Sequence, residues 1–284
     1  MSTGGLDLDL LLGAAREAVL AAAAFALDPG AEPRVETKQH AKDLVTQVDR
    51  GAERIIAERL APTGIPLHGE EQHRVEGFEE HAGPAWVVDP IDGTTNYVAT
   101  HRDWAVSLAL VDGGAPVLAV LADPVAGRLM TAIAGRGAWV GPLRSAGGGR
   151  DDEPIPIAPD LALERGAAIV PFSALRGVPG AGGVVSAALA ARAYGSAALE
   201  IAEVARGGAV AFLHGGLKPW DMAAAVLLAR EAGALVTRVD GSALDARRVG
   251  SVLAATPSAH ARVLEILARA RDAGGGAGDP TPWA

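Results

Sequence analysis

The segment with the clearest capacity for chemistry is WVVDPIDGTTN, residues 86–96. An apolar run ends at Asp89, and Gly93 allows a backbone geometry that other residues avoid. On such a turn Asp89 and Asp92 can converge on one point, and hard cations such as Mg²⁺ prefer oxygen ligands. The free amides after Gly93 can cradle a phosphate. An Asx-turn that holds no ligand is the alternative interpretation of this short motif.

Three other segments place acidic residues at the ends of predicted elements. Glu70 and Glu71 follow a predicted strand, whereas Asp49 and Asp221 each open a predicted helix. Each has an ordinary interpretation when taken alone. Paired glutamates commonly form a solvated loop, and Asp is a favoured helix N-cap.

The composition narrows the classes of partner. With a formal net charge of −9 and no basic run beyond the pair at 247–248, nucleic acid and anionic membranes are not expected as partners. The absence of cysteine excludes disulfides and thiolate zinc sites, and it suits the cytoplasm. Charged residues interrupt the N-terminal apolar stretch, so we expect no signal peptide and no apolar run of the ~20 residues that a membrane helix needs.

Hydrophobic periodicity predicts the elements that must position these residues. Helices are predicted at 7–28, after Asp49, and at 197–205, 221–232 and 258–271. Strands are predicted at 65–68, 85–88, 104–111, 117–121, 129–133, 168–171, 210–213, 234–239 and 251–255. This order predicts an α+β N-terminal part at 1–143 with most acidic positions, an α/β C-terminal part at 155–271, and a flexible tail at 272–284.

Taken together, the motifs resemble the inositol monophosphatase family of magnesium-dependent, lithium-sensitive phosphatases. The resemblance runs from about Gly13 to Ala268. It rests on the segments 43–49, 69–71, 89–96, 135–138, 195–199 and 217–224. It implies a layered αβαβα sandwich of the inositol monophosphatase and fructose-1,6-bisphosphatase type, and a homodimer.

The resemblance also implies a set of metal ligands. By this correspondence Glu70, Asp89 and the carbonyl of Ile91 bind a first Mg²⁺. A second ion lies between Asp89, Asp92 and Asp221, and a third, looser ion sits near Glu70. Crowded carboxylates repel one another, and divalent cations remove that cost while they lower the pKa of bound water.

The catalytic and phosphate-binding residues follow from the same resemblance. Thr94, hydrogen-bonded to Asp49, would position and deprotonate the attacking water, with Glu70 as the third catalytic residue. Gly93 and Thr94 would contact the phosphate. Because phosphoryl transfer needs mainly positioning and electrostatics, no covalent protein nucleophile is required.

The resemblance also implies that Ser196 and Ala197 lie where the family holds the alcohol part of the substrate. Members that act on inositol phosphate usually carry a Glu seven residues before the last metal Asp, and here that position is His214. The histidine is either an ordinary loop residue or part of an altered pocket with a different or more anionic substrate. Lys38 matches a basic residue near the metals and could hold phosphate, or it is simply exposed.

The predicted activity is hydrolysis of a small phosphate monoester, with inositol-1-phosphate or a related polyol or sugar phosphate as the first substrate. The segment 216–221 looks most like the bacterial inositol-phosphate group. Fructose-1,6-bisphosphatase, histidinol-phosphatase and 3′-phosphonucleotide phosphatase are the alternatives within the family. A regulatory partner of the transcription machinery is the alternative from another class.

Overall fold

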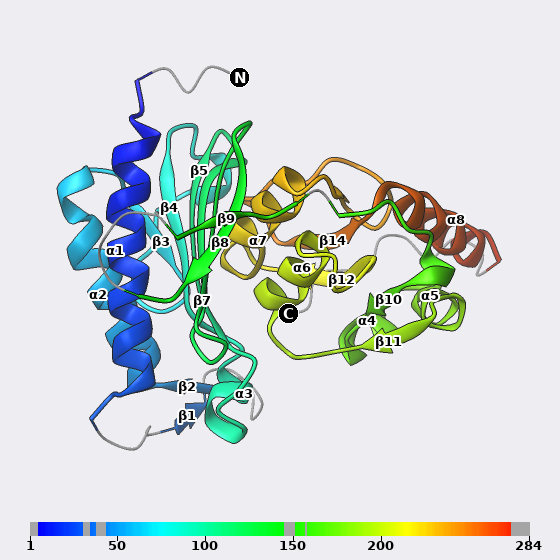
Figure 1. Ribbon diagram of the computed structural model, residues 1–284, viewed down its shortest axis with the longest axis horizontal. Helices are drawn as coiled ribbons and strands as arrows, with labels where there is room; N and C mark the ends of the chain where they lie inside the picture. Colours follow the sequence, from blue (N-terminus) through cyan, green and yellow to red (C-terminus); the bar gives the residue numbers. More distant parts are fainter. Residues whose placement is uncertain (1–4, 31–34, 38–43, 145–150, 157, 274–284) are drawn as a thin grey trace.

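Two β-sheets and three layers of helices alternate along the long axis of the molecule (Figure 1). This alternation of layers confirms the predicted αβαβα sandwich. The computed structural model describes residues 5–30, 35–37, 44–144, 151–156 and 158–273.

The larger sheet has seven strands in the order β3-β4-β5-β6-β7-β8-β9. Its strands are β3 (Leu67–Gly69), β4 (Ala85–Asp92), β5 (Ala105–Asp112), β6 (Ala115–Asp123), β7 (Arg128–Ile133), β8 (Gly137–Pro142) and β9 (Glu153–Pro154). All neighbours are antiparallel except β3 and β4, which run parallel. Tight turns join β5, β6, β7 and β8 in succession, which explains why the sequence pattern located β5, β6 and β7 well.

The smaller sheet has five strands in the order β11-β10-β12-β14-β13. They are β10 (Ala167–Ile169), β11 (Ala190–Arg192), β12 (Ala211–Leu217), β13 (Leu235–Thr237) and β14 (Gly250–Ala255). A separate two-stranded ladder pairs β1 (Val35–Thr37) with β2 (Leu44–Thr46). The division into N- and C-terminal parts at 143 and 155 stays a prediction.

The helices form the other three layers. Helices α1 (Leu8–Leu27) and α2 (Gln47–Leu60) cover the outer face of the larger sheet, and α6 (Ala197–Ala205) and α7 (Pro219–Glu231) lie between the sheets. The far face of the smaller sheet carries α4 (Phe172–Gly177), α5 (Ala181–Ala187) and α8 (Pro257–Ala273). The short α3 (Thr94–Ala99) follows β4. Helices α3, α4 and α5 and strand β11 were not predicted, because such short segments carry little periodicity.

Helix α1 contradicts one prediction made from the sequence, namely that no apolar run is long enough to cross a membrane. By length and composition alone it is apolar enough to cross a membrane, so the prediction that no run reaches that length was wrong. In the fold, Leu11, Ala15, Ala18, Val19 and Ala22 form a buried face at the spacing of a helix that packs on a core. That face contacts α2 and strands β5 and β6, and core helices meet the same length and composition test.

Helix α7 is the central element, because it packs on both sheets. It contacts strands β4 to β7 on one side and β13 on the other, and ten of its thirteen residues are buried. A helix that is apolar on every side is typical of such a central position. Small side chains, among them Ala223, Ala224 and Ala225, let the two sheets approach it closely.

Removing a large side chain from α7 tests this arrangement. Leu228 is fully buried, and Leu228→Ala should lower the free energy of unfolding by about 2–5 kcal/mol, since the central layer cannot collapse into the cavity. Leu10 on α1 is 71% exposed, and Leu10→Ala should change it by less than about 0.5 kcal/mol. Urea unfolding followed by circular dichroism measures both, and equal effects would contradict the central role of α7.

Candidate active site

Strand pairing brings the acidic segments of the larger sheet together. Strands β3 and β4 are parallel, with Gly69 opposite Val88, so both chains leave the sheet at the same edge. The amide of Glu70 donates to the carbonyl of Val88 at 3.2 Å. Glu70 therefore emerges beside Asp89, although nineteen positions separate them in the sequence.

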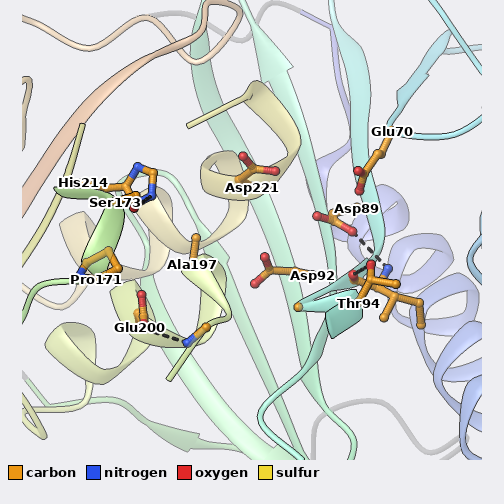
Figure 2. Close-up of a pocket in the computed structure, with 13 residues that line it drawn as sticks. Glu70, Asp89, Asp92, Thr94, Pro171, Ser173, Ala197, Glu200, His214 and Asp221 are labelled. Carbon is orange, nitrogen blue, oxygen red and sulfur yellow. Dashed lines mark hydrogen bonds between the residues drawn. The ribbon is translucent and has the colours of Figure 1, made fainter. Parts of the chain in front are cut away.

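A bulge at the end of β4 turns its two aspartates toward one pocket. Asp89 pairs with Ser107 and Asp92 with Ala105, so β4 has one more residue than β5 in this interval. In a regular strand, residues three apart point to opposite faces. The extra residue removes that opposition, and Figure 2 shows both carboxylates at the same cavity.

Gly93 allows the tight exit from β4. Its φ of 93° lies in the left-handed region, and a Cβ at this position would lie 3.1 Å from the carbonyl oxygen of Asp103 and 3.3 Å from that of Gly195. Any other residue would be strained both by its backbone and by its side chain. The chain then begins α3 at Thr94.

Asp49 and Asp221 lie inside the first turns of their helices, so the N-cap interpretation was wrong for both. Helix α2 begins at Gln47, and the cap of α7 is Lys218, whose amide donates to the carboxylate of Asp221 at 2.8 Å. Asp49 is buried, and its Oδ1 lies 3.1 Å from Thr94 Oγ1, so the hydrogen bond expected between these residues is present.

Four carboxylates, from β4, α7 and the loop after β3, line a single cavity of about 340 Å³. They belong to Glu70, Asp89, Asp92 and Asp221, and they face one another across it (Figure 2). Ile91, Gly93 and Thr94 line the cavity as well. The predicted residues thus meet in one place, whereas Lys38 lies outside the described residues.

Burial and mutual repulsion raise the pKa values of the three aspartates, Asp89, Asp92 and Asp221. Burial, with the charges of Glu70 and Asp92 adding to it, raises the pKa of Asp221 to about 8. Burial also raises the pKa of Asp92 to about 7, against the hydrogen bonds from Ser196 and the Ala198 amide. The pKa of Asp89 is raised well above its ordinary value by burial first and then by Glu70, Asp92 and Asp221. A divalent cation would remove this repulsion.

The donor set fits a hard divalent cation, because it consists of carboxylate and carbonyl oxygens. Within the part of the chain that the structure describes, no three His, Cys, Asp or Glu side chains stand as a ready metal site. The residues that line the cavity nevertheless fit a divalent cation, which would complete the site.

Ser196 has a different contact from the one expected of a substrate ligand. It is fully buried, does not line the cavity, and caps α6 by accepting from the Leu199 amide at 3.3 Å. Its hydroxyl donates to Asp92, whose Oδ2 also accepts from the Ala198 amide at 2.8 Å. The start of α6 therefore holds Asp92 in place, while Ala197 lines the cavity. Substrate binding by Ser196 stays a prediction.

Glu200 forms part of the opposite wall and was missed in the sequence. It is buried and accepts from the backbone amides of Tyr194 and Gly195, the latter at 2.9 Å (Figure 2). Burial raises its pKa despite these two hydrogen bonds. The sequence feature that could have identified Glu200 is its position four residues after Ser196. It was missed because a glutamate in the first turn of a helix is usually exposed. Pro171 and Ser173 were missed as well, because α4 was not predicted.

His214 lines the same wall, so it is not an ordinary loop residue (Figure 2). Burial lowers its pKa to about 4, so the ring is neutral at physiological pH. Its Nδ1 accepts from the Gly216 amide at 3.1 Å, which leaves the proton on Nε2 to donate to Ser173 Oγ at 3.2 Å. The serine hydroxyl hydrogen is then free to point into the cavity.

The loop after β3 contacts the start of α7 through an indole ring. The guanidinium of Arg74 lies 5.0 Å from the centre of the Trp220 ring and donates to the carbonyl of Glu70. Lys218 Nζ lies 5.3 Å from the same centre. Cation–π contacts of this kind tie the loop that carries Glu70 to the helix that carries Asp221.

Comparison with known proteins agrees with the fold and the cavity. A model of the inositol monophosphatase family matches residues 7–272. An inositol-1-monophosphatase of Bacillus subtilis (strain 168) is 32% identical over 243 residues, which cover 84% of this chain and 88% of the relative. A protein of Escherichia coli (strain K12) named Nus factor SuhB is 33% identical over 243 residues, 84% of this chain and 86% of the relative.

A solved structure of an IMPase/NADP phosphatase complexed with Mg²⁺ and phosphate matches the fold with a TM-score of 0.73 and 29% identity, covering 83% of this chain and 86% of the other. The layered fold and the acidic cavity define a phosphatase that hydrolyses phosphate monoesters. The chain belongs to the inositol monophosphatase family. Solved structures of IMPase/NADP phosphatase contain Mg²⁺ in one case and Ca²⁺ in another.

The raised pKa values predict how stability depends on pH and metal. In the folded state Asp92 and Asp221 bind protons more tightly than in the unfolded chain, so their contribution to stability should fall as pH rises from about 4 to about 8. The lowered pKa values of His68 and His214 act in the opposite direction up to about pH 6.5, so the net fall in stability should be clearest between about pH 6.5 and 8. The expected loss is several kcal/mol in the free energy of unfolding in EDTA, and saturating Mg²⁺ should largely abolish it. Urea unfolding at a series of pH values measures this. A flat profile in EDTA would contradict the repulsion.

Proposed function

We propose that this chain hydrolyses small polyol or sugar monophosphates, with inositol-1-phosphate as the first candidate, using Mg²⁺ and a directly attacking water. The observation that carries the proposal is the single cavity that four carboxylates line, close to the Thr94–Asp49 hydrogen bond. We further propose that the protein acts in the cytoplasm as a homodimer, in line with its lack of cysteine and its family.

The chain's own residues divide the chemistry between them. Glu70, Asp89, Asp92, Asp221 and the carbonyl of Ile91 would hold the metal. Bound Mg²⁺ supplies positive charge that lowers the pKa of coordinated water and stabilises the charge developing on the phosphate. With these carboxylates engaged as metal ligands, water is the attacking group in this proposal.

Thr94 and Asp49 would orient that water. Thr94 Oγ1 lies 3.1 Å from both Asp49 Oδ1 and the carbonyl of Ile91, so its proton is directed away from the cavity. The lone pairs of Thr94 are left to accept a proton from water, while its own proton passes toward Asp49. The first amides of α3, at Thr94 and Thr95, have no acceptor within the helix and would bind phosphate oxygens.

The opposite wall supports a neutral, hydroxylated alcohol. Among the described residues that line the cavity there is no Lys or Arg. Ser173 presents a hydroxyl donor, Glu200 a carboxylate acceptor, and Ala197 an apolar contact, while the ring of His214 is uncharged. The idea that His214 favours a more anionic substrate is therefore not supported. A second phosphate would find no cationic partner among these described lining residues, which disfavours fructose bisphosphate and nucleoside bisphosphates.

A regulatory role in transcription is the second candidate. It is supported by the relatives named Nus factor SuhB, including the one from Escherichia coli. Nothing in the cavity requires such a partner, and a purely regulatory protein would not need four carboxylates gathered in one cavity. Catalysis is therefore the first proposal, and the two roles are compatible.

Asp92→Asn tests the catalytic proposal. The substitution removes a charged oxygen from the cluster but keeps the shape, so turnover with Mg²⁺ should fall by at least about 10²-fold while the protein stays folded. Phosphate release from inositol-1-phosphate measures turnover, and circular dichroism verifies folding. Asp112→Asn, at the far end of β5, serves as the control and should keep its rate. A near wild-type rate for Asp92→Asn would refute the assignment.

Ser173→Ala tests the alcohol wall. Loss of one hydroxyl donor should lower kcat/KM for inositol-1-phosphate by about 5–30-fold, the equivalent of about 1–2 kcal/mol. The rate with p-nitrophenyl phosphate, which carries no ring hydroxyls, should change little. Ser186→Ala, whose hydroxyl donates to its own helix at Gly182, is the matched control. Fructose bisphosphate, histidinol phosphate and adenosine 3′,5′-bisphosphate complete the panel, and faster turnover of any of them would overturn the substrate class.

A further inference from the structure

Helix α2 carries a second buried carboxylate, one turn beyond Asp49. Glu53 is 0% exposed and Asp49 is 1% exposed. Residues four apart lie on the same face of a helix, so both carboxylates point inward from α2 toward the larger sheet. Asp49 contacts Thr94, whereas Glu53 contacts the loop that follows β3.

Glu53 accepts four hydrogen bonds from three consecutive residues. Its Oε2 lies 2.7 Å from the amide of Glu71, and its Oε1 lies 2.7 Å from the amide of Gln72 and 2.8 Å from that of His73. The ring Nδ1 of His73 lies 2.8 Å from the same Oε1. A fully buried carboxylate with this many donors holds its surroundings in a single arrangement.

The loop that follows β3 closes tightly around Glu53, and Gly69 at the end of that strand has little room for a side chain. A Cβ on Gly69 would lie 2.5 Å from Glu53 Oε2. The amide of Gly69 donates to the carbonyl of His73 at 2.9 Å, so residues 69–73 form a closed turn around the carboxylate. Glu70 is the residue of this turn whose side chain lines the cavity.

We propose that Glu53 is a positioning residue that sets the metal affinity of the site by fixing Glu70. This inference rests on the proposed function, because Glu70 is taken there as a metal ligand. Helix α2 then supports two parts of the site from one rigid element, since Asp49 orients Thr94 and Glu53 orients Glu70. The two carboxylates should therefore have separable effects, one on turnover and the other on metal binding.

Glu53→Gln is the direct test, because it keeps the size of the side chain. Its NH₂ group would face the amide of Glu71 or of Gln72, so at least one donor loses its acceptor and the turn shifts. Calorimetric titration of the metal-free protein with Mg²⁺ should show a dissociation constant raised by about 10-fold or more. At saturating Mg²⁺, kcat should fall by a smaller factor than the affinity does.

Asp49→Asn provides the contrast and Glu58→Gln the control. Asp49→Asn should lower kcat at saturating Mg²⁺ by about 30-fold or more while the dissociation constant for Mg²⁺ stays within about 3-fold of wild type. Glu58 lies on the same helix but is exposed and paired with Arg54, so Glu58→Gln should change neither quantity.

A second variant keeps the inference falsifiable if Glu53→Gln does not fold. Gly69→Ala pushes a methyl group against Glu53 without removing its charge, and it should also weaken Mg²⁺ binding. An unchanged dissociation constant in folded Glu53→Gln or Gly69→Ala protein would overturn the positioning role and leave the proposed function intact. Wild-type protein that binds Mg²⁺ but hydrolyses no phosphate ester would instead contradict the proposed function.

Discussion

Repulsion among buried carboxylates is the constraint on which the rest of this structure depends. Asp89, Asp92 and Asp221 all have raised pKa values because they are buried and lie near one another or near Glu70. A folded chain keeps such a cluster only if the surrounding fold is stable enough to carry its cost. A divalent cation removes that cost, so the same interaction that strains the free protein provides the free energy of metal binding.

The scaffold delivers these groups from elements that are far apart in the sequence. The parallel pair β3 and β4 brings Glu70 beside Asp89, a bulge turns Asp92 inward, and α7, between the two sheets, adds Asp221. Short-range contacts then fix each group, as the start of α6 does for Asp92 and Lys218 does for Asp221. The cavity consequently lies where both sheets and the central helices meet, and neither sheet could form it alone.

The two walls of the cavity differ in their density of charge. One wall concentrates negative charge and attracts cations, whereas the other presents the neutral His214–Ser173 pair and the carboxylate of Glu200. A phosphate group therefore has favourable interactions only on the metal side. The alcohol would be bound by single hydrogen bonds, and this combination supports the proposed monophosphate of a hydroxylated alcohol.

The sequence by itself determined the family, the layered fold and the segments that supply the acidic cluster, because strand alternation, helix periodicity and turn glycines are local properties. The helix 197–205 has the bounds that its pattern predicts. Only the tertiary structure decided which side chains became buried partners. Asp49 and Asp221 resembled N-caps, but their helices begin two residues earlier. Glu200 is buried under the backbone amides just before its own helix, and Glu53 is buried under amides of a loop about twenty residues away. Burial depends on contacts between segments remote in sequence, and no local pattern encodes them.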